Sequence, residues 1–176
     1  LQFRKSHLKF SRLNHIFISH LHGDHCFGLL GLISTLNLLG RTAELHIHSP
    51  KGLETLLTPM LDFFNRQMTY KVLFHEFDTK EPMLIYEDRS LTVTTIPLRH
   101  RMPCCGFLFA EKRRPNHIIR EMVDFYQVPV YELNRIKNGA DYVTPEGKTV
   151  SNNLLTRPSA PSRSYASVSY THLRAH

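Results

Sequence analysis

Short β-prone runs and longer apolar stretches alternate along the first hundred residues of the chain. The apolar stretch from Phe27 to Leu39 is long enough for a helix, and Gly40 follows it in the position of a helix C-terminal glycine. Shorter runs rich in β-branched and aromatic residues predict strands. These predicted strands are His15–Ser19, Ala43–His48, Tyr70–Phe77, Met83–Tyr86, Leu91–Leu98 and Cys105–Ala110.

A second helix is predicted directly after the second of these strands. Ser49 has the side chain of an N-cap and Pro50 fits the first helical position, so we expect a helix that runs to about Gln67. Pro59 lies within this helix and is a possible break. Strands and helices that alternate early, followed by several strands, predict an α/β fold in which helices cover at least one sheet.

From Glu111 onward the pattern of the sequence changes. Residues 112–115 read Lys-Arg-Arg-Pro, a basic cluster that ends in a helix breaker. We interpret about 111–150 as an excursion from the main body, and from Ser151 onward the chain is rich in Ser, Asn and Pro and no structure is predicted. The elements predicted within the excursion are short helices over 116–126 and 129–137 and a small hairpin over 143–150.

A dense polar cluster, Ser-His-Leu-His-Gly-Asp-His, directly follows the first predicted strand. In an extended segment His20 and His22 point to the same side, because side chains repeat every two residues, so their imidazoles can chelate one ion. Gly23 permits a sharp turn with unusual dihedral angles, after which Asp24 and His25 can face a second ion. Imidazole nitrogens and carboxylate oxygens are ligands that zinc takes in catalytic sites. The cluster therefore predicts a metal site.

The charge of the chain is unevenly distributed. The sequence has 12 histidines and a formal net charge of +7. Basic residues exceed acidic ones in residues 1–43 and 99–176, whereas acidic residues exceed basic ones between them. A basic surface suits a polyanionic partner such as a nucleic acid. Two basic ends around a metal motif favour that interpretation, although a solvated charged surface would have the same composition.

Length and composition exclude several classes of protein. A chain of 176 residues of which 41% are hydrophobic can form about one domain with a core, which excludes a disordered chain. The sequence holds no apolar run of about 18 residues, which argues against a transmembrane helix. Three cysteines do not make a secreted disulfide framework, so we expect a reducing compartment, the cytoplasm.

The run His-Leu-His-Gly-Asp-His after a hydrophobic strand resembles the metal-binding motif of the metallo-β-lactamase superfamily. The residues around it, 8–19 before and 27–32 after, resemble the ribonuclease Z family within that superfamily, and the resemblance runs from about Leu1 to Ala166. It implies an α/β fold of the metallo-β-lactamase type, a four-layer αββα sandwich. It also implies a zinc-dependent endoribonuclease that removes the 3′ trailer from precursor tRNA.

The same resemblance implies the roles of particular residues. The segment 96–100, Ile-Pro-Leu-Arg-His, followed by Cys-Gly-Phe at 105–107, matches the family's next ligand position. The complete enzyme would carry two Zn²⁺ per subunit, and Asp24 would also accept a proton. The implied ligands are His20, His22 and His100 for one zinc and Asp24 and His25 for the other.

The excursion over about 111–150 corresponds by this resemblance to a protruding arm that grips the tRNA. Residues 131–139 resemble the arm's distal helix and turn, whereas the Gly-Pro-rich element usual before that helix is reduced to Val128-Pro129-Val130. The resemblance further implies precursor tRNA as partner, a homodimer, and no membrane. The basic residues expected to bind the substrate are Lys112, Arg113, Arg114, Arg135 and Lys137.

The chain departs from the family near its end. Ser164-Tyr165-Ala166 matches the start of the stretch that carries the family's bridging aspartate, but no aspartate follows Asp141. We therefore expect residues 1–166 to be a partial metallo-β-lactamase-type domain cut at both ends, and 167–176 to be a non-native tail. We expect this fragment by itself to have little or no hydrolytic activity.

Two other functions remain open from the sequence. One is a different hydrolase of the same fold that acts on small esters, and the other is a basic RNA-binding module with a decayed site. The arm-like segment and the basic ends argue against the first. His46 and His48, two apart on one strand, are interpreted as ordinary strand positions, and no function is assigned to His15 or His75.

Overall fold

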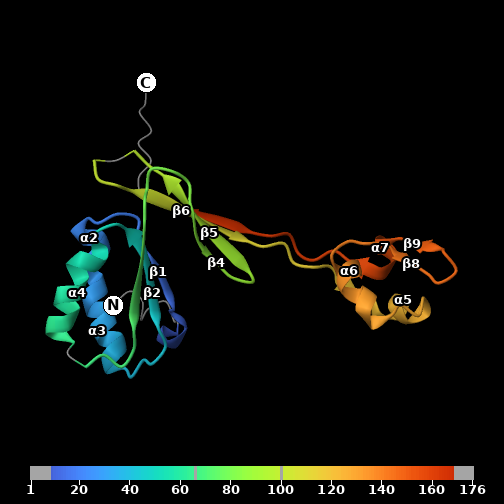
Figure 1. Cartoon of the computed structure of the whole chain (residues 1–176), viewed down its shortest axis with the longest axis horizontal. Helices are drawn as coiled ribbons and strands as arrows, with labels where there is room; N and C mark the ends of the chain where they lie inside the picture. The colour runs from blue at the N-terminus through green and yellow to red at the C-terminus, as the bar shows by residue number, and fades with distance from the viewer. Residues whose placement is uncertain (1–8, 66, 100, 169–176) are drawn as a thin grey trace. The chain divides into compact units, whose positions relative to one another are not determined.

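A computed structural model describes residues 9–65, 67–99 and 101–168 of the chain (Figure 1). The described residues divide into two compact units, and each unit has a hydrophobic core of its own. Unit 1 lies within 9–87, 92–109 and 165–168, and unit 2 comprises 88–91 and 110–164.

Unit 1 begins with a three-stranded parallel sheet and two long helices. Its first elements are η1 (Phe10–Arg12), β1 (His15–Phe17), α3 (Gly28–Leu38), β2 (Leu45–Pro50), α4 (Leu53–Phe64) and β3 (Val72–Phe77). The strand order is β1–β2–β3, and His15 of β1 lies opposite His46 of β2. In Figure 1, α3 and α4 lie on the same side of this sheet. The sheet is therefore covered on one face by helices, as predicted.

The hydrophobic core of unit 1 lies between this sheet and the two helices. Ile47 of β2, Ile33 of α3 and Leu53 of α4 are completely buried in it. Burial of each such side chain stabilises the fold by roughly 1.5–3 kcal/mol. The buried hydroxyl of Tyr70 donates a hydrogen bond of 2.9 Å to the carbonyl of Ile33, which ties the segment before β3 to α3.

The second sheet of unit 1 consists of β4 (Leu84–Glu87), β5 (Leu91–Pro97), β6 (Cys105–Glu111) and β11 (Ser164–Ser167), in the order β11–β6–β5–β4. Aromatic rings lie between the two sheets. The ring centroid of Phe17 on β1 lies 5.7 Å from that of Phe107 and 5.3 Å from that of Phe109 on β6. Phe77 on β3 also lies 6.2 Å from Phe107. These contacts join the two sheets face to face, and the predicted α/β class is confirmed.

The helix predicted to start at Ser49 is wrong at its start. Ser49 and Pro50 are the last residues of β2, where Ser49 pairs with Glu76 of β3, and α4 starts only after Gly52, whose φ is 108°. The Glu76 carboxylate accepts hydrogen bonds of 2.9 and 3.0 Å from the backbone N–H groups of Gly52 and Glu54. A side chain from a neighbouring strand thus satisfies the helix start in place of the predicted local cap.

The predicted C-terminal end is confirmed for α3 but is wrong for α4. α3 ends at Leu38, and Gly40 beyond it has a φ of 74°, which confirms the predicted C-terminal glycine. α4 continues through Pro59 without a break and ends at Phe64, before the predicted end at Gln67. Proline lacks a backbone N–H, so α4 loses one internal hydrogen bond there without ending.

No helix within the described ranges is both long and apolar enough to cross a bilayer.

α4 has one face buried in the core and another face exposed. Leu57 and Leu61 are buried in the core of unit 1, whereas Leu56, Met60 and Phe63 are exposed. The exposed residues follow one another at helical spacing and form an apolar stripe on the outer face of α4.

Unit 2 is built from short elements: β7 (His117–Ile118), α5 (Arg120–Phe125), η2 (Val130–Glu132), α6 (Leu133–Lys137), β8 (Tyr142–Val143), β9 (Thr149–Val150), α7 (Asn152–Leu155) and β10 (Thr156–Arg157). The predicted small hairpin is confirmed as β8 and β9, which pair antiparallel. The helix predicted over 116–126 is wrong in its first residues, because β7 pairs with β10 there. Its remaining residues form α5.

The segment after Ser151, for which no structure was predicted, contains α7, β10 and β11. Asn152 explains much of this order. Its side-chain amide donates to the carbonyls of Ile136 and Ala140 at 2.6 and 2.7 Å, and its backbone N–H donates to the Asp141 carboxylate at 2.7 Å. One polar side chain therefore fixes this segment to α6 and its following turn, although the local composition resembles a loop.

Candidate active site

The predicted metal motif lies between β1 and α3, beyond the carboxyl end of the parallel sheet. The backbone N–H of Ile18 still donates to the carbonyl of His48 on β2 at 2.8 Å, so the chain leaves the sheet just before the motif. A short helix, α2 (Gly23–Cys26), then turns the chain, and the N–H of His25 donates to the carbonyl of His22 at 3.0 Å. The carboxyl ends of parallel strands are where open α/β sheets bind their ligands.

Two imidazoles of the motif, those of His22 and His25, lie around that of His20. The ring centroid of His20 lies 4.0 Å from that of His25 and 4.8 Å from that of His22. The His20 side chain is completely buried, and the Ser19 hydroxyl lies 2.9 Å from its Nδ1, which holds the ring in place. Asp24 is largely exposed, and its Oδ2 lies 3.4 Å from Nε2 of His25. The structure thus brings together four of the residues predicted to bind metal.

The fifth predicted ligand, His100, lies outside the described residues. Within the part of the chain that the structure describes, no group of three or more His, Cys, Asp or Glu side chains is arranged to hold a metal ion. The donor types of the motif do fit zinc, because neutral imidazole nitrogens and a carboxylate oxygen are its usual ligands. The motif therefore suits a metal in chemistry, while a complete ligand set is not formed by the described residues.

Gly23 is required for a different reason from the one predicted. Its φ is not positive, so the turn does not depend on a conformation reserved for glycine. A Cβ atom at this position would lie 2.4 Å from Cε2 of the Phe27 ring. The absence of a side chain therefore allows the Phe27 ring to pack over the first turn of α2.

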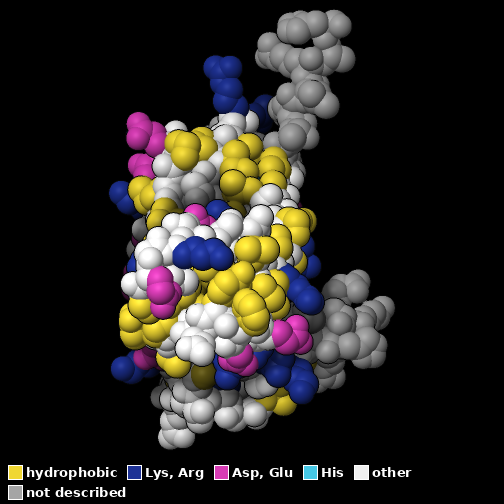
Figure 2. Space-filling view, turned by 90° about the vertical axis from the view of Figure 1, so that its right-hand side faces the viewer, with side chains coloured by type: hydrophobic (Ala, Val, Ile, Leu, Met, Phe, Trp, Pro, Cys, Tyr) yellow, Lys and Arg dark blue, Asp and Glu magenta, His cyan; other side chains and the backbone are white. Residues whose placement is uncertain are grey.

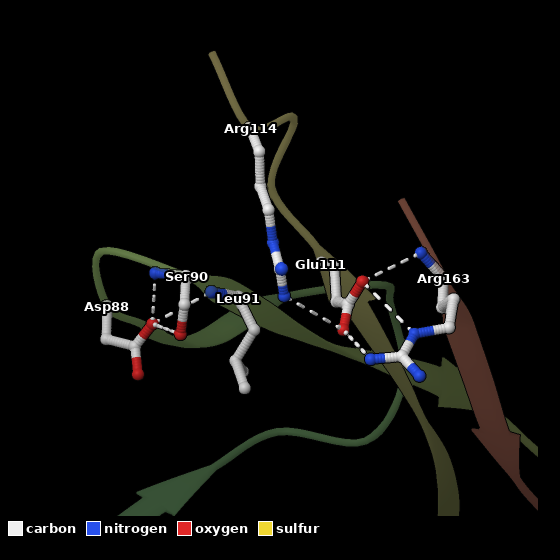
Figure 3. Close-up of polar contacts among 6 residues, drawn as sticks. All are labelled: Asp88, Ser90, Leu91, Glu111, Arg114 and Arg163. Atoms are coloured by element: carbon white, nitrogen blue, oxygen red, sulfur yellow. Dashed lines mark hydrogen bonds and ion pairs between the residues drawn. The ribbon is translucent and has the colours of Figure 1, made fainter. Parts of the chain in front are cut away.

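The predicted substrate-binding residues lie in unit 2, and Arg114 belongs to an ionic cluster there (Figure 3). Glu111 accepts hydrogen bonds from Arg163, 2.8 Å from Nη2 and 3.1 Å from the backbone N–H, and lies 3.8 Å from Arg114. The hydrogen bonds from Arg163 lower the pKa of Glu111. Arg114 therefore shares the Glu111 carboxylate with Arg163. Lys112 is held through its backbone, since its N–H donates to the Ser90 carbonyl at 2.7 Å.

The other predicted substrate-binding residues differ in their surroundings. Arg135 forms an exposed ion pair of 3.0 Å with Glu132, one turn earlier in the chain. Lys137, at the end of α6, and Arg113 are exposed. Figure 2 shows one face of the molecule, on which hydrophobic side chains lie among lysine and arginine side chains. Exposed aromatic residues of unit 2 include Phe125 and Tyr131.

A second group of imidazoles, from residues far apart in the sequence, lies between the two sheets of unit 1. His15 stacks on His46 at 4.7 Å between centroids, and His48 stacks on His75 at 4.8 Å. Hydrogen bonds join the two pairs: Nδ1 of His15 lies 3.2 Å from Nε2 of His48, and Nδ1 of His46 lies 2.9 Å from Nε2 of His75. Tyr86 of β4 covers His15 at 4.4 Å. We name these four histidines the strand cluster.

Two histidines of the strand cluster, His48 and His75, have surroundings that favour the neutral imidazole. Burial, and to a smaller extent the neighbouring His75, His15 and His46, lower the pKa of His48 to about 4. Burial also lowers the pKa of His75, with a smaller contribution from His46. A ring-to-ring hydrogen bond needs one nitrogen that donates and one that accepts, which neutral imidazoles provide.

The alternation of His46 and His48 was the only sequence signal for this cluster. It shows that both side chains share a face of β2, but it does not identify their neighbours. His15 and His75 lie far away in the sequence and join them only through the parallel register of β1, β2 and β3.

The chain is similar to proteins of known family over most of its length. The family model described as "Beta-lactamase superfamily domain" matches residues 2–119. "Ribonuclease Z" of Bacteroides fragilis is 76% identical over 99% of this chain, and that of Bacteroides thetaiotaomicron is 77% identical over 97%. The chain spans 57% and 54% of these two relatives. The crystal structure of human tRNase Z, short form, matches 64% of this chain and 51% of its own, with a TM-score of 0.56 and 31% identity.

Proposed function

The chain belongs to the β-lactamase superfamily, and from this membership we propose that its protein is a metal-dependent endoribonuclease that removes the 3′ trailer from precursor tRNA. One observation carries the proposal. The imidazoles of His20, His22 and His25 gather at the carboxyl end of β1 in a chain that is 76% identical to a protein named ribonuclease Z.

Two zinc ions are the metals that this donor set would suit. His20, His22 and His100 would hold one ion, and Asp24 and His25 the other. Zinc in such a site supplies a Lewis acid for hydrolysis of a phosphodiester. The exposed carboxylate of Asp24 can accept a proton at Oδ2, while the Ser19 hydroxyl keeps the buried His20 ring in a fixed orientation.

The tRNA would be held by unit 2 acting as the arm predicted over about 111–150. Its cations, all exposed except the half-buried Lys112, supply contacts to phosphates, and its exposed aromatic side chains supply surfaces for bases or sugars. Phosphate contacts carry little sequence information, so selection among RNAs would rest on tRNA shape. The cations proposed for this role are Lys112, Arg113, Arg114, Arg135 and Lys137.

A homodimer and a cytoplasmic location are part of the same proposal. The apolar stripe of Leu56, Met60 and Phe63 on α4 supports association with a second copy, because such stripes mark interaction surfaces. The three cysteines are free and buried, as expected in a reducing compartment.

The 176 residues alone are proposed to have little or no activity, with 1–166 as a partial domain and 167–176 as a non-native tail. This part of the proposal rests on the lack of any aspartate after Asp141 to bridge two metals. Zinc-dependent cleavage by residues 1–176 at the rate of a complete ribonuclease Z would contradict it.

The experiment that tests the proposed function compares substrates on the complete protein. Precursor tRNA with a 3′ trailer, a small lactone and a thioester are incubated with the zinc-loaded protein, and products are resolved by gel and chromatography. We expect cleavage at the trailer junction, and we expect chelation of the metal to abolish it. Hydrolysis of the small esters without cleavage of precursor tRNA would identify a different hydrolase. RNA binding without any hydrolysis or zinc would identify a binding module.

A further inference from the structure

A cavity of about 570 Å³ opens in unit 1 beyond the carboxyl ends of β2, β3 and β5. Its volume lies in the range of about 300–1,000 Å³ that is usual for small-ligand pockets. The wall is built from four short segments that each follow or precede a strand end. These segments are 50–51, 77–80, 97–99 and 101–104.

The cavity has an apolar floor and a cationic rim. Phe77 and Cys104 lie at the back of the cavity, but they are 5% and 1% exposed and so offer a ligand little surface. The half-buried Leu98 and Met102 line the same space and form its apolar floor. The four cationic side chains of the rim, all exposed, are Lys51, Lys80, Arg99 and Arg101.

The rim keeps most of its positive charge. Asp78 is the one acidic residue among the lining residues, and its Oδ1 already accepts the backbone N–H of Lys80 at 2.9 Å. Among the residues that the structure describes, no carboxylate forms an ion pair with any of the four rim cations. Cations left unpaired around an apolar floor suit an anionic ligand that also carries an apolar or aromatic group.

The cavity adjoins the metal motif on two sides. The turn after β2 packs against the motif, since a Cβ atom at Gly52 would lie 3.6 Å from Cδ1 of Leu21. On the other side, the backbone N–H of Cys105 donates to the carbonyl of Ser19 at 3.0 Å. Lys51 and Cys104 line the cavity, and each directly precedes a residue that contacts the metal motif. These residues are Gly52, which approaches Leu21, and Cys105, which bonds to Ser19.

We infer that this cavity binds one nucleotide of the RNA substrate next to the phosphodiester that is cleaved. The phosphate would contact the rim cations, and the base would lie over the floor of Leu98 and Met102. This inference rests on the proposed function and adds a subsite to it. A phosphate and a flat base match the two surfaces, and stacking on an apolar floor accepts any base.

Two pairs of variants on opposite ends of the same sheet test this inference. In the complete protein, Lys51→Ala with Lys80→Ala removes two rim cations that follow β2 and β3. Arg12→Ala with Lys71→Ala removes two exposed cations that precede β1 and β3, at the opposite ends of the strands. All four side chains are exposed, so neither pair is expected to alter folding, and thermal melting of both checks this.

The main measurement is the affinity for a single-stranded tetranucleotide by fluorescence anisotropy across a range of salt concentrations. We expect the rim pair to bind about tenfold more weakly, as when a charge-assisted hydrogen bond is lost. We also expect its salt slope to fall by about 1.4, since each lost phosphate contact on a single strand removes about 0.7. The control pair should bind like the unaltered protein. Equal affinity for the rim pair and the control pair would overturn the inference.

Cleavage of precursor tRNA separates this inference from the proposed function. If the unaltered protein cleaves precursor tRNA and the rim pair raises KM above that of the control pair, both stand. If it cleaves and the rim pair matches the control in binding and KM, the subsite is wrong. If it does not cleave but the rim pair alone loses tetranucleotide affinity, the proposed reaction is wrong and the nucleotide pocket stands.

Discussion

Two groups of imidazoles lie in unit 1, and they are built in different ways. The metal motif takes three histidines from a single turn of chain, and a carboxylate lies 3.4 Å from one of them. The strand cluster takes four histidines from three strands, with each ring stacked on and hydrogen-bonded to others of the cluster. Each of these ring-to-ring hydrogen bonds occupies one ring nitrogen of both partners, and an occupied nitrogen is not available to a metal. Density of histidine in space is therefore a poor guide to a metal site unless the ring nitrogens are considered.

The largest difference between the two groups should appear in catalysis. His22→Ala should lower cleavage of precursor tRNA by at least about 100-fold, which is more than the loss of an outer-shell partner usually costs. His46→Ala, which also alters a half-buried histidine, should leave the rate nearly unchanged. Single-turnover cleavage and zinc content measured by mass spectrometry provide the two readings. Similar losses in both variants would mean that the strand cluster also serves the reaction.

A second difference should appear in the pH dependence of stability. The pKa of His48 is about 4 in the folded protein and about 6.5 when unfolded, so the unfolded chain binds more protons between these values. Stability should therefore fall as the pH falls from about 6.5 to about 4, by at most about 3 kcal/mol from this residue.

Urea unfolding of the protein and of His48→Gln, at several pH values in this window, measures that dependence. The variant should show a shallower fall in the free energy of unfolding, and His75→Gln should reduce the fall less, because the pKa of His75 is lowered to a smaller degree. An unchanged slope in His48→Gln would show that this imidazole is not held neutral by its surroundings.

The smallest expected effect concerns the local packing of the metal motif. Gly23→Ala places a Cβ atom against the Phe27 ring, so it should destabilise the protein by about 1 kcal/mol. The double variant with Phe27→Ala removes the opposing ring and should recover most of the loss, which a double-mutant cycle in urea would show. Additive losses would mean that the Gly23–Phe27 contact is not what requires glycine here.

Local rules succeeded where a segment's neighbours in sequence are also its neighbours in space. α3 and its following Gly40 are examples, as are the strands of the small hairpin β8–β9. They failed at Ser49, where the pattern of an N-cap was overridden by pairing with Glu76 on β3. They also failed after Ser151, where the local composition resembles a loop. There the Asn152 side chain donates hydrogen bonds to carbonyls of α6 and the turn after it, and these bonds order the segment.

The sequence by itself determined the chemistry of the metal motif. Three histidines and an aspartate within six residues must stay close in any fold, because the chain between them is too short to separate them. The resemblance to the metallo-β-lactamase superfamily followed from the same residues, and the family match bears it out.

Only the tertiary structure decided which other side chains meet. The parallel register of three strands assembled the strand cluster, and the ends of β2, β3 and β5 together formed the cationic cavity beside the motif. Each group draws members from segments that lie tens of residues apart, so no local pattern contains the whole of either group. Burial of the apolar face of the sheet against α3 and α4 fixes that register, because a shift by one residue would turn every core side chain to the opposite face.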